Sequence, residues 1–186
     1  MTTFLTPAKK TVADLLESAI IRRFKDGRGQ GYGKDYKPFL TVRDVHSKGR
    51  VHRRPSIIHG RIVHLLSDLE LAAFLLFDWH ESVVDIREQF PLDPEKTITI
   101  ANRLGIKHPF AKGVKQVMTT DLLIDLMKGG QRVTQAISIK YRQDLEDPRV
   151  IEKQEIEKRF WEAEQTEFFI FTENQKILKI DRSRCC

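Results

Sequence analysis

The 186-residue chain has almost no cysteine and no long apolar run. Its two cysteines, Cys185 and Cys186, are adjacent at the end of the sequence, so they supply neither a disulfide framework nor a four-ligand zinc site. No apolar stretch approaches the roughly 20 residues that a membrane span needs. The first ten residues, MTTFLTPAKK, lack the pattern of a signal peptide. These absences predict a cytoplasmic protein that is not bound to a membrane and that folds around an apolar core alone.

Positive charge is concentrated at the start of the chain. The first 64 residues contain 14 Lys and Arg against 5 Asp and Glu, whereas the remainder contains 18 against 21. The densest basic cluster includes Arg50, Arg53 and Arg54, and a mildly basic stretch around Lys107 follows later. Such asymmetry is typical of a protein that binds a polyanion, most plausibly DNA or RNA. A solvated basic surface without a ligand would have the same composition.

The apolar pattern and the turn residues predict a mixed α/β domain with a central sheet. Residues 1–175 are expected to form this domain, followed by a short tail over 176–186. The expected elements are a helix over 7–25, a glycine-rich loop over 27–36, short strands within 37–64, a helix over 67–77, a strand over 83–92, a turn-rich segment over 93–116, a strand hairpin over 117–140, a helix over 148–165 and a strand over 168–172.

The glycine-rich loop, GRGQGYGKDY, does not match the phosphate-binding loop G-x-x-x-x-G-K-[ST]. The residue five positions before Gly33 is Arg28, and the residue after Lys34 is Asp35. The loop also follows a helix rather than a strand. It is therefore interpreted as a flexible basic loop that either contacts a phosphate backbone or serves as a plain linker.

The hairpin over 117–140 organises the rest of the chain. Its Gly129-Gly130 pair suits a two-residue turn, because glycine tolerates the positive φ that such turns need. This turn places Asp121 opposite Ser138 and projects both from the same face as Lys140. A carboxylate and a lysine on neighbouring strands occur in metal-dependent nucleases. They also occur as an ordinary surface ion pair on a half-solvated sheet.

Glu70 has two possible roles. Ser67 followed three residues later by Glu70 is a capping box, in which the glutamate only satisfies a backbone N–H. A glutamate in the first turn of a buried helix can also face an active site. Spacing alone does not choose between the two.

Six stretches of the sequence resemble the TnsA-type endonuclease family of heteromeric cut-and-paste transposases. They are GRGQGYGKDYKPFLTV, HLLSDLELAAFL, DIREQFPL, GIKHP, QVMTTD and SIK, and with their order and spacing the resemblance spans about residues 22–172. The resemblance is to the N-terminal catalytic domain of the family. It implies a restriction endonuclease-like fold, in which helices flank a mixed central sheet in a single α/β domain.

The resemblance also implies an active site. It assigns the catalytic carboxylates to Glu70 and Asp121 and the catalytic lysine to Lys140. Glu70, Asp121 and the backbone carbonyl of Ile139 would bind Mg²⁺, which prefers oxygen ligands, with Mn²⁺ as a possible substitute. On this basis Glu70 is expected to be a ligand as well as a cap. The basic residues Arg50, Arg53, Arg54 and Lys107 are expected to contact DNA.

Family members cut the 5′ ends of a transposon in double-stranded DNA and work with a TnsB-type transposase and a TnsC-type ATPase regulator. Two departures bear on this expectation. Ser138 stands where the wider nuclease superfamily has Glu, Asp or Gln. The sequence also stops at Cys186, without the winged-helix-like C-terminal domain that is implicated in contacting the regulator, so that contact is left open. The alternatives are a non-catalytic DNA-binding or assembly module and a stand-alone nuclease.

Overall fold

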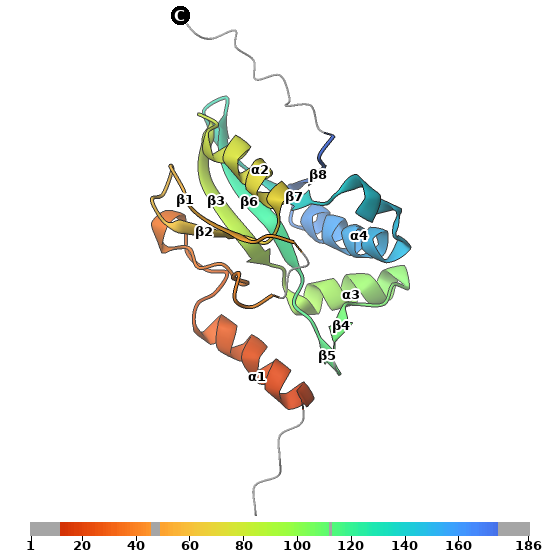
Figure 1. Cartoon of the computed structure of the whole chain (residues 1–186). Helices are drawn as coiled ribbons and strands as arrows, with labels where there is room; N and C mark the ends of the chain where they lie inside the picture. Colours follow the sequence, from red (N-terminus) through yellow and green to blue (C-terminus); the bar gives the residue numbers. More distant parts are fainter. Residues whose placement is uncertain (1–11, 46–48, 112, 175–186) are drawn as a thin grey trace, which may run out of the picture.

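A four-stranded mixed sheet forms the centre of the molecule (Figure 1). The computed structural model describes residues 12–45, 49–111 and 113–174. The strand order is β3 (Val83–Pro91), β6 (Thr119–Lys128), β7 (Gln131–Ile139) and β8 (Glu167–Phe171). The first three strands are antiparallel neighbours, and β8 joins β7 in parallel. The expected mixed central sheet is confirmed.

Helices cover both faces of this sheet. Helix α2 (Asp68–Asp78) packs on one face, where Phe74 joins a core with Ile86, Ile124 and Ile137. Helix α4 (Pro148–Ala163) packs on the other face, where Trp161 meets Leu123 and Ala136. Helix α3 (Pro94–Leu104) lies beside α4. Because successive residues of a strand point to opposite faces, each central strand contributes to both cores.

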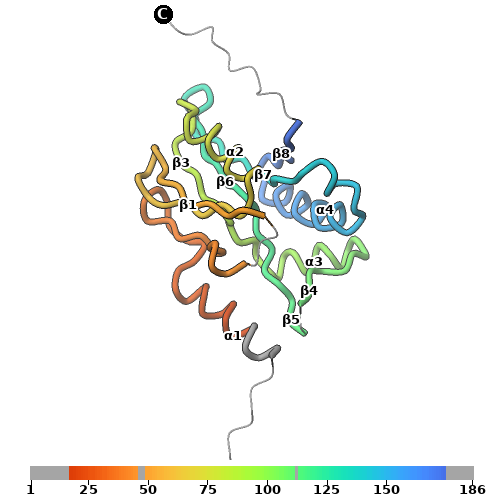
Figure 2. Tube along the Cα trace, viewed as in Figure 1, coloured from red at the N-terminus to blue at the C-terminus, as the bar shows by residue number. Residues whose placement is uncertain are grey.

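The N-terminal part of the chain lies along the β3 edge of the sheet, away from α4 and β8 (Figure 2). It contains α1 (Val12–Lys25), the short 3-10 helix η1 (Gly33–Asp35), and a separate hairpin of β1 (His52–Pro55) and β2 (Ile62–Leu65). The Tyr36 hydroxyl donates to the carbonyl of Glu88, and the Phe39 amide donates to the carbonyl of Gln89. These contacts attach the glycine-rich loop to β3.

Three short elements complete the described chain. Strands β4 (Phe110–Ala111) and β5 (Val114–Lys115) form a small hairpin after α3. The 3-10 helix η2 (Arg142–Glu146) connects the end of β7 to α4. Within the described residues, no helix is both long enough and apolar enough to cross a membrane.

Most of the expected elements are confirmed. Gly129 and Gly130 form the hairpin turn, with φ of 59° and 80°, and Lys128 pairs with Gln131 as predicted. Strands β3 and β8 and helices α2 and α4 agree with their expected ranges to within a few residues. The expected start of the first helix at residue 7 and the tail over 176–186 lie outside the described residues.

Two expectations are wrong. Residues 93–116 were expected to be turn-rich, but α3 occupies Pro94–Leu104. The carboxylate of Asp93 accepts hydrogen bonds from the amides of Glu95 and Lys96, and Gly105 ends the helix with a φ of 67°. Both are standard helix signals. Residues 38–42, expected to be a strand, form bends and a turn instead.

Asp44 connects the N-terminal segment to the turn that follows it. Its carboxylate accepts hydrogen bonds from the amide and hydroxyl of Thr41, and it forms ion pairs with Arg28 at 2.7 Å and Arg23 at 3.2 Å. Burial raises the pKa of Asp44, but the hydrogen bonds from Thr41 and Arg28 outweigh it and lower the pKa to about 2. The ionised carboxylate therefore stabilises the folded protein.

We expect Asp44→Asn to lower the free energy of unfolding by about 1–3 kcal/mol at pH 7. Because the folded pKa lies below the unfolded value, this contribution is present above about pH 4 and is lost as the pH falls towards 2. Urea denaturation of both proteins at pH 7 and pH 3 measures the difference. The exposed Asp144→Asn in η2 is the control and should change stability by less than about 0.5 kcal/mol. An equal difference between Asp44→Asn and wild type at both pH values would contradict this account.

Candidate active site

The candidate active site lies where β6 begins and β7 ends. Asp121 is the third residue of β6, and Ile139 and Lys140 are the last residue of β7 and the residue after it. Glu70 comes from the first turn of α2. Thus two adjacent strands and one helix bring together the three residues that the sequence singled out.

Asp121 is the centre of this arrangement. The pairing of β6 with β7 runs as far as Leu122 and Ile137, so Asp121 stands opposite Ser138 just beyond it. One oxygen of its carboxylate, Oδ2, accepts the backbone amide of Ile139 at 2.6 Å and the Ser138 hydroxyl at 3.4 Å. The same oxygen accepts Nζ of Lys140 at 2.7 Å. The structure therefore places Asp121, Ser138 and Lys140 on one face, as the hairpin register predicted.

The ammonium group of Lys140 bridges two oxygens from different strands. Besides Asp121, it donates to the backbone carbonyl of Ile139 at 2.8 Å. Burial lowers the pKa of Lys140, but the negative charges of Asp121 and Glu157 outweigh this effect and raise it. Lys140 is therefore a cation held between a carboxylate oxygen and a carbonyl oxygen.

Glu70 is both a capping residue and part of the site. Its backbone amide donates to Ser67 Oγ at 3.1 Å, which confirms the N-cap. Its buried carboxylate, however, accepts the amide of Leu66 at 2.9 Å through Oε2. Burial, followed by the nearby charge of Asp121, raises the pKa of Glu70 to about 7. The two carboxylates are therefore close enough to repel each other.

These oxygens could hold a divalent cation. The Glu70 and Asp121 carboxylates and the Ile139 carbonyl are hard oxygen donors of the kind that Mg²⁺ and Mn²⁺ accept. Lys140 already occupies a cation position between two of them. In the part of the chain that the structure describes, no three His, Cys, Asp or Glu side chains gather as a metal cluster. Any metal would therefore need the backbone carbonyl, water or substrate oxygens as further ligands.

Glu157 is a residue of the site that the sequence analysis missed. It lies on α4, is 3% exposed, and accepts a hydrogen bond from the Thr120 hydroxyl at 2.8 Å. The indole of Trp161 donates to the same hydroxyl at 2.7 Å. Burial and then the charge of Asp121 raise the pKa of Glu157 to about 7, although hydrogen bonds from Thr120 and Ser138 oppose the shift.

One signal in the sequence points to Glu157. It lies three residues after Gln154 and four before Trp161, which is the spacing of a single helix face, and all three side chains are buried. A glutamate on the buried face of a helix is uncommon without a partner. The sequence analysis predicted the helix over 148–165 but did not consider which of its residues face the sheet.

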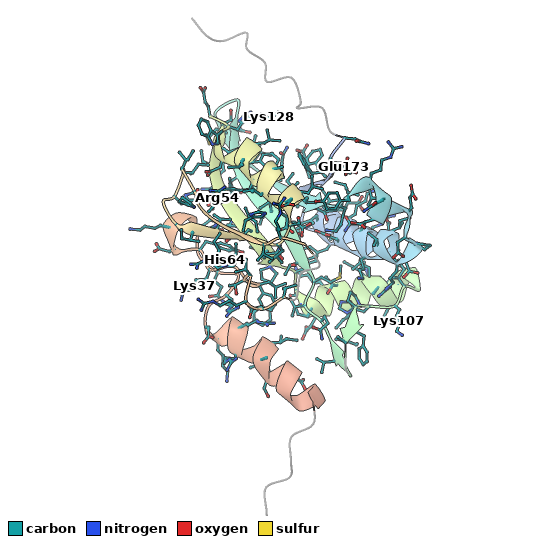
Figure 3. All side chains as sticks on the ribbon, in the orientation of Figure 1. Lys37, Arg54, His64, Lys107, Lys128 and Glu173 are labelled. Atoms are coloured by element: carbon teal, nitrogen blue, oxygen red, sulfur yellow. The ribbon has the colours of Figure 1, made fainter. Side chains whose placement is uncertain are left out.

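The basic residues expected to bind DNA do not form one cluster. Arg53 and Arg54 are exposed on β1, and Arg50 just before it pairs with Asp68 at 3.0 Å. Lys107 is exposed in the loop after α3. Figure 3 shows Arg54 and Lys107 on opposite sides of the molecule in this view. The structure therefore separates Lys107 from the arginines near β1.

A mixed sheet with Asp121 and Lys140 on adjacent strands and Glu70 on a flanking helix defines a restriction endonuclease-like domain. The profile of the family described as TnsA-like endonuclease N terminal matches residues 80–173. This range contains Asp121 and Lys140 but begins after Glu70. The chain belongs to the TnsA-like endonuclease family.

The chain is also 52% identical, over 166 residues, to the transposon Tn7 transposition protein TnsA of Escherichia coli. The aligned region covers 89% of this chain and 60% of that relative. The chain thus spans about 60% of the relative's length.

The raised pKa of Glu157 has a measurable effect on stability. A carboxyl group whose pKa is higher in the folded than in the unfolded protein binds its proton more tightly when folded. As the pH rises from about 4.5 through 7, wild type should therefore lose stability relative to a variant with a neutral amide at this position. We expect Glu157→Gln to be more stable than wild type by about 1–3 kcal/mol at pH 8 and nearly equal to it at pH 5.

Chemical denaturation of both proteins at the two pH values, in the presence of EDTA, measures this difference. Glu155→Gln, on the same helix but ion-paired with Arg159 near the surface, is the matched control. It should change stability by less than about 0.5 kcal/mol at either pH. A Glu157→Gln variant that is less stable than wild type at pH 8 would show that the folded protein favours the ionised carboxylate.

Proposed function

We propose that this chain is the DNA endonuclease subunit of a transposase and hydrolyses phosphodiester bonds at the 5′ ends of a transposon. The observation that carries the proposal is the convergence of the Asp121 carboxylate, the Ile139 carbonyl and the Lys140 ammonium at one end of the sheet. Glu70 adds a second carboxylate from α2. Membership of the TnsA-like endonuclease family supports the same function.

The site would use Mg²⁺, with Mn²⁺ as a substitute. Glu70, Asp121 and the carbonyl of Ile139 would hold the cation. When bound, a divalent cation neutralises phosphate charge and lowers the pKa of an attacking water. Burial and then the negative charge of Asp121 raise the pKa of Glu70, and a bound cation would relieve this repulsion.

Lys140 would stabilise the negative charge that develops on the phosphate during hydrolysis. Its raised pKa keeps it protonated, so that its Nζ can donate to a phosphate oxygen. Its contacts with Asp121 and the Ile139 carbonyl fix the position of Nζ before DNA binds. After Asp121, Glu157 on α4 also contributes negative charge that favours the ammonium form.

The substrate would be double-stranded DNA held by the basic N-terminal part of the chain. Arg53 and Arg54 project from β1 into solvent, and Arg50 lies just before that strand. Lys107, on another side of the molecule, would be a separate contact. Contacts of this kind bind phosphates without reading sequence, so site choice would come from a partner.

That partner would be a TnsB-type transposase that cuts and joins the 3′ ends, acting with this chain in the cytoplasm. The relative from Escherichia coli is named as a transposition protein of transposon Tn7. Binding of a TnsC-type ATPase regulator is left open, because the family resemblance assigns that contact to a winged-helix-like C-terminal domain.

The direct test is nicking of labelled transposon-end DNA by this chain, with its partner transposase and Mg²⁺ or Mn²⁺ present. We expect 5′-end cleavage by wild type and a loss of about 100-fold or more in Asp121→Asn and Glu70→Gln. The surface variant Lys153→Ala on α4 should cleave like wild type.

Three outcomes would contradict the proposal in different ways. No cleavage by wild type, while the partner still cuts the 3′ ends, would leave the non-catalytic assembly module. Equal cleavage with and without the transposase would indicate a stand-alone nuclease. Cleavage that persists in Asp121→Asn would place the active site elsewhere.

DNA affinity provides a further prediction. Each Lys or Arg that contacts a phosphate contributes about 0.9 to the slope of log affinity against log salt concentration. The double variant Arg53→Ala/Arg54→Ala should weaken binding of any duplex sequence and reduce this slope by about 2. Fluorescence anisotropy at several salt concentrations measures both quantities. Lys153→Ala/Lys158→Ala, which removes two exposed charges from α4, is the control and should leave the slope unchanged.

A further inference from the structure

Gln89 has an unusual backbone for a residue in the middle of a strand. Its neighbours Glu88 and Phe90 pair with Leu122 and Thr120 of β6, but Gln89 itself has a φ of 48°. Few residues other than glycine adopt a positive φ, and such outliers concentrate at functional sites. By the register of its neighbours, Gln89 stands opposite Asp121. The backbone of β3 is therefore distorted next to the candidate active site.

The side chain of Gln89 joins two elements of the site. It is 2% exposed, and its Nε2 donates to Oε2 of Glu70 at 3.3 Å. Its Oε1 accepts the hydroxyl of Thr119 at 3.2 Å. Thr119 lies on β6 two residues before Asp121. The amide thus forms a bridge from the carboxylate on α2 to the strand that carries the other carboxylate.

The carboxylate of Glu70 fixes which way the amide points, because the Thr119 hydroxyl can either donate or accept. A rotated amide would place Oε1 of Gln89 against the carboxylate of Glu70, where two acceptors repel each other. With Thr119 donating to Oε1, the NH₂ group faces Glu70 instead. The backbone carbonyl of Gln89 accepts the amide of Phe39, which holds the distorted segment from the other side.

We infer that Gln89 is a positioning residue that holds Glu70 in the orientation in which it binds a divalent cation, and that Thr119 links the Gln89 amide to β6. This inference rests on the proposed function. Glu70 also receives contacts from its own helix entry, through Leu66 and Ser67. Gln89 is the residue through which it is tied to the sheet, and so to the position of Asp121.

The test is titration of the metal-free chain with Mn²⁺, followed by electron paramagnetic resonance of the free ion. Gln89→Met keeps the length of the side chain and removes both hydrogen bonds. Partners of metal ligands typically affect metal affinity by 10- to 100-fold, so we expect the dissociation constant for Mn²⁺ to rise by about 10-fold. Nicking should slow at low Mn²⁺ and recover at high Mn²⁺, which a merely structural role of Gln89 would not produce.

Thr119→Val completes a double-mutant cycle. This variant should also weaken Mn²⁺ binding, but by less than Gln89→Met does. The double variant should bind Mn²⁺ like Gln89→Met alone, because both changes break the same bridge. Gln135→Met, on β7 away from the site, is the matched control and should bind Mn²⁺ like wild type. Gln89→Asn, which tolerates a positive φ but is too short to reach Glu70, carries the test if Gln89→Met does not fold.

The outcomes separate this inference from the proposed function. Unchanged Mn²⁺ affinity in the folded Gln89 variants, with binding lost in Glu70→Gln, would overturn the role of Gln89 and leave the metal site intact. Absence of Mn²⁺ binding and of nicking in wild type would overturn both. Effects of Gln89→Met and Thr119→Val that simply add would overturn the proposed bridge.

Discussion

Three contacts to one carboxylate oxygen of Asp121 hold together the end of the central sheet. β6 and β7 stop pairing just before this point, so the amide of Ile139 finds its acceptor in a side chain rather than in the neighbouring strand. Without Asp121 this amide and the ammonium of Lys140 would both lose a partner in a mostly buried place. The interaction that closes the hairpin therefore also fixes the positions of Ile139 and Lys140.

The site gathers carboxyl groups in a largely buried place. Glu70, Asp121 and Glu157 surround a single ammonium group, and the pKa values of both glutamates are raised to about 7. Burying carboxylates that are not fully paired costs stability. Apolar cores on both faces of the sheet supply the stability that offsets this cost. Proteins commonly keep such unfavourable arrangements where function requires them.

The sequence could predict the parts of the site that local rules determine. The Gly129-Gly130 turn fixes the hairpin register, and the register places Asp121 with Lys140. Helix α3 could also have been predicted, because Asp93 and Gly105 carry its cap signals. It was not recognised because its sequence is only weakly apolar. By contrast, only the family resemblance assigned Glu70 to the site. The capping pattern alone was enough to explain a glutamate at this position.

Gln89 and Glu157 could not be predicted in the same way. The positive φ of Gln89 has no local signal, because the residue is neither glycine nor asparagine and sits within an ordinary strand pattern. It is held by contacts with Phe39, Glu70 and Thr119, which come from three separate parts of the chain. Glu157 depends on how α4 packs against the sheet. The roles of both residues therefore depend on tertiary contacts that no local sequence pattern indicates.

Glu157 also bears on the departure at Ser138. By the resemblance described above, the wider nuclease superfamily carries an acid or an amide at the position of Ser138, and a serine there is a shorter ligand. In this chain the Ser138 hydroxyl donates to Asp121 Oδ2 at 3.4 Å, and the Glu157 carboxyl lies close to the same hydroxyl. Helix α4 thus places a carboxyl group near the serine. Burial lowers the pKa of Lys140, whereas the charges of Asp121 and then Glu157 raise it. The serine therefore does not leave the site short of carboxyl groups.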